Sequence, residues 1–184
     1  MPMRTAADAV IRLEEIDDRA HSVDVERRAF EHSPSGDPAN DIGAIVERVR
    51  DEDGSFALVA QEHGHILGHV QFSRGWVGET PVVTLGPVGV VPERQNRGIG
   101  STLIRTGLDE ARRRGEIAAI VLGDPRYYKR FGFETGSTLG LANPATGVTP
   151  SGFEILEEHF MVAPLAPGGA DQLAGEVRWH PALG

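Results

Sequence analysis

One stretch of the sequence, residues 84–100 (TLGPVGVVPERQNRGIG), constrains the fold more strongly than the rest. It opens as a run rich in β-branched residues and ends with Gly98 and Gly100 at the start of a helical pattern. Glycine and proline inside a strand pattern usually mark a bulge, or a close approach by a ligand or another backbone. The stretch therefore predicts an irregular strand, a short polar connector and a glycine-rich helix entry.

The segments on either side supply a regular order of elements. Apolar positions at helical spacing predict a helix after the glycines, and Gly115 stands where that helix should end. A short, wholly apolar run after it predicts a buried strand. In chain order, the expected strands are 9–13, 56–61, 66–73, 82–91, 117–122, one at Phe133 and 159–165, and the expected helical segments are 23–30, 41–50, 99–114 and 126–130.

This order predicts an α/β protein with a mixed sheet of the α+β kind, in which an antiparallel meander precedes a strand-helix-strand unit. Gly64 fits a tight turn between the second and third strands. A chain of 184 residues suffices for a single domain, residues 1–184. The glycine- and proline-rich segment 166–184 is expected to be a C-terminal extension, to which the sequence assigns no structure.

The composition argues against several classes of function. The formal net charge of −9 argues against nucleic acid as the main partner, because phosphate binding requires a basic face. The absence of cysteine excludes a disulfide framework, a thiolate metal site and a cysteine nucleophile. The sequence shows neither a secretory signal pattern nor an apolar run of bilayer length. We therefore expect a cytoplasmic protein with no membrane partner.

The glycine-rich helix entry suits a pyrophosphate. Backbone N–H groups at a helix N-terminus attract anions, and Arg94 and Arg97 add positive charge nearby. Two common phosphate motifs do not fit this segment. A dinucleotide-binding fingerprint requires a third glycine where Leu103 stands, and a P-loop requires a lysine that the segment lacks. A nucleotide-binding α/β domain is therefore the weakest of the alternatives.

Residues 95–100, QNRGIG, resemble the acetyl-CoA signature of the GNAT superfamily of N-acyltransferases, Gln/Arg-x-x-Gly-x-Gly/Ala, at every fixed position. The context strengthens the resemblance, because the family has a bulged strand before the motif, and a long helix and a buried strand after it. The block YYKRFGF at 127–133 resembles a bacterial subgroup of predicted acetyltransferases. The resemblance spans roughly residues 56–133. It implies a GNAT-like fold with splayed central strands, and transfer of an acetyl or related acyl group from acetyl-CoA (acyl-CoA) to an amine.

The resemblance also implies which residues contact the cofactor. By position, the Val88 N–H would polarise the thioester carbonyl, and Val90 would pair with the pantetheine amides. The N–H groups of residues 96–100, together with Ser101, would hold the pyrophosphate. The implied cofactor-binding residues are Val88, Val90, Gln95, Asn96, Arg97, Gly98, Ile99, Gly100 and Ser101.

Tyr128 stands four residues before Gly132, where the family carries its general acid. A phenol, whose ordinary pKa is about 10, can protonate a departing thiolate without ionising first. We interpret its neighbour, Tyr127, as a packing residue. Asp124 and Pro125 depart from the family, in which many members have an asparagine at this helix start.

The sequence leaves the general base unassigned. The acceptor ammonium must lose a proton before it attacks, and His69 and Glu79 are candidates to take it. A metal set of His63, His65 and His69 is disfavoured, because two of these histidines lie at a hairpin tip and no cysteine assists them. We therefore predict surface histidines and no metal site.

The sequence does not specify the amine acceptor, although an acidic protein would attract a cationic small molecule or a basic protein segment. Residues 32–40 and 136–153 are expected to shape the acceptor pocket, because long loops carry function on such scaffolds. A homodimer is an open alternative to a monomer. A catalytically silent member of the fold, which senses acyl-CoA or binds a partner, is the alternative to an enzyme. Tyr128 favours the enzyme, since a sensor needs no acid at the thioester.

Overall fold

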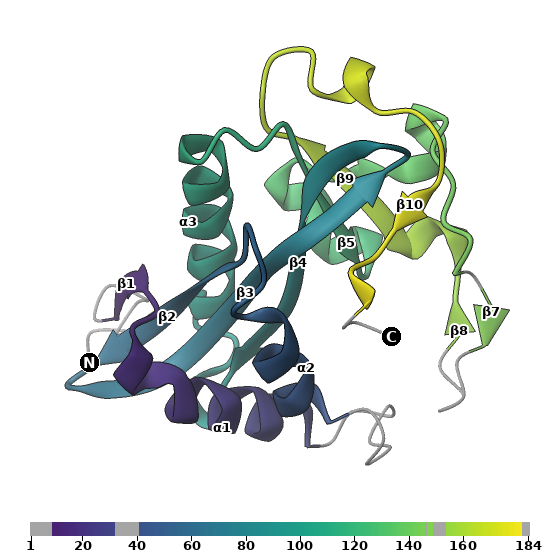
Figure 1. Cartoon of the computed structure of the whole chain (residues 1–184). Helices are drawn as coiled ribbons and strands as arrows, with labels where there is room; N and C mark the ends of the chain where they lie inside the picture. The colour runs from purple at the N-terminus through teal and green to yellow at the C-terminus, as the bar shows by residue number, and fades with distance from the viewer. Residues whose placement is uncertain (1–8, 32–40, 146, 149–153, 182–184) are drawn as a thin grey trace.

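A mixed β-sheet forms the centre of the structure, a computed structural model that describes residues 9–31, 41–145, 147–148 and 154–181 (Figure 1). Among these residues, eight strands form the sheet in the order β1-β2-β3-β4-β5-β9-β6, with β10 alongside β3. The first four strands are antiparallel neighbours, whereas β4 and β5 are parallel. The predicted meander and the strand-helix-strand unit that follows it are therefore confirmed.

Four strands make up the meander. His63 and Gly64, between the second and third strands, have positive φ angles of 50° and 82°, as in the hairpin turns that match strand twist. The third and fourth strands are longer than the sequence predicted, because Gly75 continues the ladder opposite Val82 instead of ending it. The bounds are β1 (Val10–Leu13), β2 (Phe56–Glu62), β3 (His65–Val77) and β4 (Thr80–Val90).

Helices cover both faces of the meander (Figure 1). Gly68 and His69, successive residues of β3, face opposite sides of the sheet. A side chain at Gly68 would meet Leu103 of α3, whereas His69 contacts Glu26 of α1. None of the helices in the described ranges is long and apolar enough to cross a bilayer. The main helices are α1 (Arg19–Phe30), α2 (Ile42–Val49), which packs against α1, and α3 (Ile99–Arg113).

The α3 face holds the larger apolar core. Leu103 and Ile104 of the helix are fully buried against the meander, where the rings of Phe56 and Phe72 stack at 4.7 Å. Gly107 allows the helix to approach closely, since a Cβ at this position would overlap the Phe72 ring. The spacing of α3 and its close packing thus fix the position of the helix entry relative to β4.

β4 and its parallel neighbour β5 (Ala118–Leu122) diverge soon after they meet. Within the described ranges they pair only at two positions, Val83 with Ala119 and Thr84 with Ile120. Past Thr84, the register of β4 against β3 shifts at residues 86–87. The predicted bulge and the splay of the central strands are both confirmed.

The C-terminal half extends the sheet beyond β5. β9 (Phe160–Pro164) is antiparallel to β5, and β6 (Glu134–Thr135) pairs with β9 at the edge. The tail returns to the meander, where β10 (Val177–Arg178) pairs with the end of β3. The expected loop 136–153 includes β7 (Gly147–Val148), which pairs with β8 (Glu154–Ile155). The predicted acceptor loop 32–40, and residues 146 and 149–153 of the second loop, lie outside the described residues.

We predict that Gly107→Ala destabilises the protein even though alanine is the better helix former. Helix propensity favours alanine by about 1 kcal/mol, but the new methyl group would overlap the buried Phe72 ring. Overpacking a close-packed core costs about 1–3 kcal/mol or more, so the free energy of unfolding measured in urea should fall. Asp109→Ala, at an exposed position of the same helix, is the matched control. Equal stability of the two variants would contradict the packing argument.

Candidate active site

The outer edge of β4 faces the gap left by β5. Val91, directly after the strand, donates its N–H to the Leu67 carbonyl at 2.9 Å, so it forms a hydrogen-bonded pair with β3. Such pairs alternate along antiparallel strands, and the register is continuous from Val88 onward. The N–H groups of Val88 and Val90 are therefore directed away from β3. Both residues expected to meet pantetheine lie where an extended ligand could add to the sheet.

The helix entry combines residues in the left-handed backbone conformation with glycines that carry no side chain. Asn96 and Gly98 have positive φ angles of 57° and 83°, and Gly98 is the N-cap of α3. The first N–H groups of a helix have no intrahelical acceptor, so those of Ile99, Gly100 and Ser101 are available to an anion. A Cβ at Gly100 would make only ordinary van der Waals contact, 3.6 Å from the Tyr127 hydroxyl and 3.7 Å from Val90, so no protein atom presses on the backbone there. This arrangement fits the pyrophosphate expected from the sequence.

The connector between β4 and α3 is fastened by polar side chains. Gln95 donates from Nε2 to the Val90 carbonyl at 3.0 Å, which ties the connector to the end of the strand. Arg94 forms an ion pair with Glu62, whose side chain is almost fully buried. Arg97 is exposed. We expected both arginines to add charge for a pyrophosphate, but Arg94 neutralises Glu62 instead.

Tyr128 lies in the apolar core on the α3 face of the sheet. Its ring rests on Gly123, where a Cβ would overlap it, and packs edge-on against Phe133 at 5.7 Å. Burial raises the pKa of Tyr128, and charges at Tyr127 and Glu26 raise it further. The phenol therefore stays protonated at neutral pH, as a proton donor must.

A short helix, α4 (Pro125–Tyr128), presents the two tyrosines. Asp124 caps it by accepting the N–H two residues ahead at 2.8 Å. The departure from the family's asparagine thus keeps a capping side chain, because aspartate and asparagine both serve at N-caps. Tyr127 is the less buried tyrosine, and the Arg130 guanidinium lies 4.5 Å from its ring centroid. It packs on Tyr128 at 5.1 Å, as expected of a packing neighbour.

A buried acid–imidazole pair lies beside β4 on the opposite face of the sheet. His69 Nδ1 is 2.7 Å from Glu26 Oε1, and both side chains are fully buried. The second carboxylate oxygen, Oε2, lies against Gly89, where a Cβ would be only 2.6 Å away. Burial raises the pKa of Glu26, and the hydrogen bond from His69 opposes that rise. His69 is therefore not a surface histidine. Its imidazole contacts Glu26, and Glu26 in turn lies against Gly89 of β4.

Glu26 was not predicted from the sequence as a site residue, although its spacing from Ser22 indicated a buried position. Glu26 follows Ser22 by four residues, and both lie on the buried face of α1. A carboxylate at such a position is almost never buried without a partner. Glu79, a candidate base, is fully exposed at the turn between β3 and β4, at the opposite end of β4 from Val88. Its position removes Glu79 from the site.

The remaining histidines and acids do not gather around a common point. No group of three side chains that could hold a metal ion occurs within the described part of the chain. His63 and His65 are exposed at the turn between β2 and β3, whereas His69 is buried. The three histidines considered as a metal set are thus separated by their exposure.

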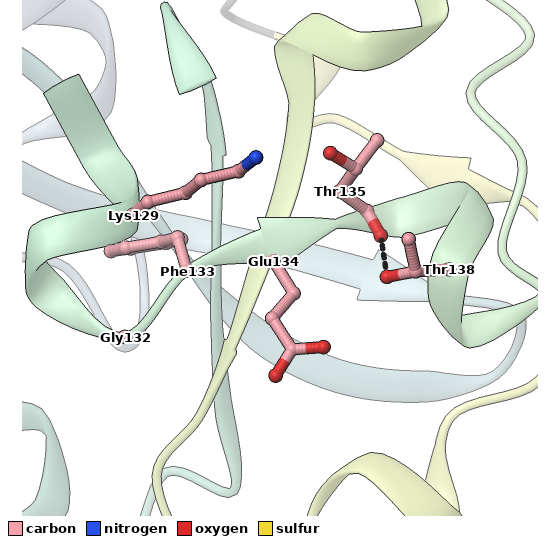
Figure 2. A pocket seen from close by; sticks show the side chains of 6 residues that line it. All are labelled: Lys129, Gly132, Phe133, Glu134, Thr135 and Thr138. Carbon is pink, nitrogen blue, oxygen red and sulfur yellow. Dashed lines mark hydrogen bonds between the residues drawn. The ribbon is translucent and has the colours of Figure 1, made fainter. Parts of the chain in front are cut away.

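An open hollow of about 370 Å³ lies at the edge of the sheet beside β6 (Figure 2). Figure 2 shows Lys129 and Glu134 pointing away from each other, so they do not converge on a common ligand. The hollow includes no residue of the helix entry or of β4, and we do not assign the active site to it. Its lining residues are Lys129, Gly132, Phe133, Glu134, Thr135 and Thr138.

Comparison with known families agrees with this geometry. Residues 12–133 match the Acetyltransferase (GNAT) family. The chain therefore belongs to the GNAT family, whose membership supports acyl transfer from acetyl-CoA in general.

Relatives and solved structures extend the comparison to most of the chain. The chain is 35% identical over 144 residues to the uncharacterized N-acetyltransferase YjhQ of Escherichia coli K12, spanning 74% of this chain and 71% of that protein. The crystal structure of YhbS from E. coli in complex with CoA has a TM-score of 0.79 at 28% identity, covering 99% of this chain and 94% of that one. The crystal structure of a GNAT acetyltransferase from Brucella melitensis in complex with acetyl-CoA has a TM-score of 0.72 at 31% identity, covering 96% of this chain and 98% of that one. The predicted GNAT-like fold is confirmed.

We predict that Gly100→Val weakens acetyl-CoA binding without destabilising the free protein. Its Cβ would meet no protein atom closer than 3.6 Å, so only a ligand lying against the backbone would collide with it. For the wild type, acetyl-CoA at one hundred times its Kd should stabilise the fold by about 2.7 kcal/mol, measured as a rise in Tm. Gly98→Val is a poorer test, because a φ of 83° strains any β-branched residue.

Asp109→Val serves as the control for Gly100→Val. It places the same side chain at an exposed position of α3, away from the helix entry, and should keep the full acetyl-CoA shift. A full shift in Gly100→Val as well would mean that the pyrophosphate binds elsewhere.

Proposed function

We propose that this protein is an N-acetyltransferase that moves an acetyl group from acetyl-CoA directly to an amine within a ternary complex. The observation that carries the proposal is the free edge of β4, where the N–H groups of Val88 and Val90 are directed away from β3 just before the glycine-rich entry of α3. Family membership supports the same ligand, as do the CoA complex of YhbS and the acetyl-CoA complex of the B. melitensis protein.

The pyrophosphate, the pantetheine arm and the thioester of acetyl-CoA each have a suitable partner in this arrangement. The N–H groups at the start of α3, with the exposed Arg97 nearby, suit the pyrophosphate. The edge of β4 suits pantetheine, because its amides can hydrogen-bond to a strand as another strand would. The Val88 N–H then reaches the thioester carbonyl and stabilises the negative charge that develops on its oxygen during attack.

Tyr128 is the proton donor in this mechanism. Its ring is held by Gly123 and Phe133, so the hydroxyl has a fixed position. The raised pKa keeps the proton on the phenol until the C–S bond breaks and a thiolate needs it. The nitrogen loses a proton when it becomes an amide, and that proton can restore the phenol.

The competing function is an acyl-CoA sensor or partner-binding module of the same fold. Such a protein would use the same strand edge and helix entry, but it would have no need of Tyr128. The net charge of −9 favours cationic acceptors, either a small-molecule amine or a basic protein segment. A panel of amines therefore separates the two functions and identifies the class of acceptor.

We predict that at least one amine in a panel of polyamines, aminoglycosides and lysine-containing peptides releases free thiol from acetyl-CoA. Initial-rate plots at several acetyl-CoA concentrations should intersect, because the chain has no cysteine to carry the acetyl group. Parallel lines would contradict direct transfer. Binding of acetyl-CoA without thiol release from any amine would favour the sensor.

We predict that Tyr128→Phe lowers turnover and leaves acetyl-CoA affinity nearly unchanged. The substitution keeps the buried ring and removes only the hydroxyl, while the proposed cofactor contacts are mostly backbone groups. Loss of a positioned proton donor lowers turnover by about 10²- to 10⁴-fold, measured where chemistry is rate-limiting.

Tyr127→Phe is the adjacent control for Tyr128→Phe. It removes a hydroxyl from the less buried ring and should leave turnover near that of the wild type. Full turnover in Tyr128→Phe would remove this residue from the mechanism, yet the assignment of acetyl-CoA would stand.

A further inference from the structure

Glu26 presents an unpaired carboxylate oxygen to the strand that borders the proposed thioester site. We infer that Glu26 is the general base that takes a proton from the acceptor ammonium, and that His69 is the positioning residue that holds it. This assignment rests on the acetyl transfer proposed above and supplies the proton acceptor that the sequence leaves open.

The two oxygens of the Glu26 carboxylate have different surroundings. Oε1 is 2.7 Å from His69 Nδ1, which donates to it when the carboxylate is ionised. Oε2 is buried and makes no hydrogen bond of normal geometry among the described residues, although the Gly89 backbone lies close enough to the carboxylate to lower its pKa. A buried acceptor without a partner is unfavourable, and an N–H of an incoming ammonium would satisfy it. The structure thus has one oxygen fixed by His69 and the other, equally buried, without a side-chain partner.

Gly89 brings this oxygen close to the reacting centre. Oε2 lies 2.6 Å from where a Cβ of Gly89 would stand, so only glycine lets the carboxylate rest on the backbone here. Gly89 separates Val88 and Val90, whose N–H groups are directed away from β3. We therefore place the reacting nitrogen, at the moment of attack, between the thioester and this carboxylate.

The acid and the base lie on opposite faces of the sheet. Tyr128 belongs to the core beneath α3, whereas Glu26 projects from α1 on the other side. The raised pKa of Tyr128 comes mainly from burial, with smaller contributions from Tyr127 and from the charge of Glu26. This placement suits a reaction in which the amine arrives from one face and the thiolate leaves toward the other.

His69 connects Glu26 to two further buried charges. Its Nε2 is 3.8 Å from Glu14 Oε1, which is 3.6 Å from Arg50 Nη2. The side chains of Glu14 and Arg50 are only 7% and 6% exposed. The row alternates carboxylate, imidazole, carboxylate and guanidinium, so each buried acidic group has a basic neighbour in the interior.

The titration of Glu26 sets the expected pH dependence. The groups that face it are His69 on β3, Glu14 and Arg50 behind that ring, and Tyr128 across the gap, while β4 contributes only glycine and valine at this point. Burial raises the pKa of Glu26, whereas His69 and the backbone of Gly89 lower it without cancelling the rise. A base must be ionised, so turnover should be lost as the pH falls through the raised pKa.

The protons balance in one cycle. The acceptor enters as an ammonium and leaves as an amide, so its nitrogen loses two protons while the C–N bond forms and the C–S bond breaks. Glu26 takes the first proton before attack and later releases it to solvent. Tyr128 gives its proton to the thiolate, and the second proton from nitrogen replaces it. One proton is released for each acetyl group transferred.

The test is Glu26→Gln in the full chain, with n-butylamine and aniline as the probe amines. At pH 7 n-butylamine is an ammonium and requires a base, whereas aniline is already neutral. With n-butylamine, kcat/KM should fall by about 10²- to 10⁴-fold, the range for losing a positioned proton acceptor, and should recover as the pH rises. With aniline it should stay unchanged, and acetyl-CoA should still raise Tm.

Two further variants separate the base from a structural role. Asp24→Asn removes an exposed carboxylate from the same helix and should change neither rate. His69→Gln removes the imidazole interactions that lower the pKa of Glu26, so this pKa should rise and the acidic limb of kcat/KM should move to higher pH. That shift supports the inference even if Glu26→Gln fails to fold, whereas an unmoved limb contradicts it.

The outcomes distinguish a failure of Glu26 as the base from a failure of the proposed acetyl transfer. If Glu26→Gln has the same kcat/KM as the wild type with n-butylamine, Glu26 is not the base, and the proposed acetyl transfer is unaffected. An equal loss with n-butylamine and aniline would overturn it too, because a structural defect affects both amines. If the wild type binds acetyl-CoA but releases thiol with neither amine, that result counts against acetyl transfer to simple amines itself.

Discussion

Where β4 parts from β5 after Thr84, its backbone N–H groups lose the neighbour that would otherwise pair with them. Backbone donors in a protein interior need partners, and the N–H groups of Val88 and Val90 cannot reach β3 because the ladder alternates. The bulge at residues 86–87 directs this part of the strand toward the N-terminus of α3. A ligand with an extended, amide-containing arm and an anionic group can satisfy both features, which accounts for the match between this fold and acyl-CoA.

Three glycines set how closely other groups approach this strand and its neighbours. Gly107 lets α3 rest on the Phe72 ring, which brings the helix entry near β4. Gly123 seats the ring of Tyr128, and Gly89 seats the carboxylate of Glu26. A Cβ at any of the three would displace the group that it meets. The positions of the proposed acid and base thus depend on glycine at these places and, for Glu26, also on its hydrogen bond with His69.

Local signals in the sequence sufficed for the strand, connector and helix of residues 84–100, because glycine, proline and helical spacing act over a few residues. They also indicated Tyr128 through a compact motif. The pairing of Glu26 with His69 spans 43 residues and depends on how α1 lies on the sheet, so no local pattern reveals it. The same limit applies to Arg94, which finds Glu62 only in the folded chain, and to β10, which returns to β3 from the far end of the chain.

The buried carboxyl group of Glu26 and the buried imidazole of His69 are hard to explain by stability alone. Removing an ion pair from water carries a desolvation penalty that its attraction often fails to offset, and apolar residues of similar size would hold α1 on the sheet as well or better. The unpaired Oε2 of Glu26 adds to that penalty. A reacting amine that arrives with a positive charge and an N–H supplies what this oxygen lacks. The arrangement is therefore unfavourable in the resting fold and complementary to the proposed substrate, which is the relation expected of groups kept for catalysis.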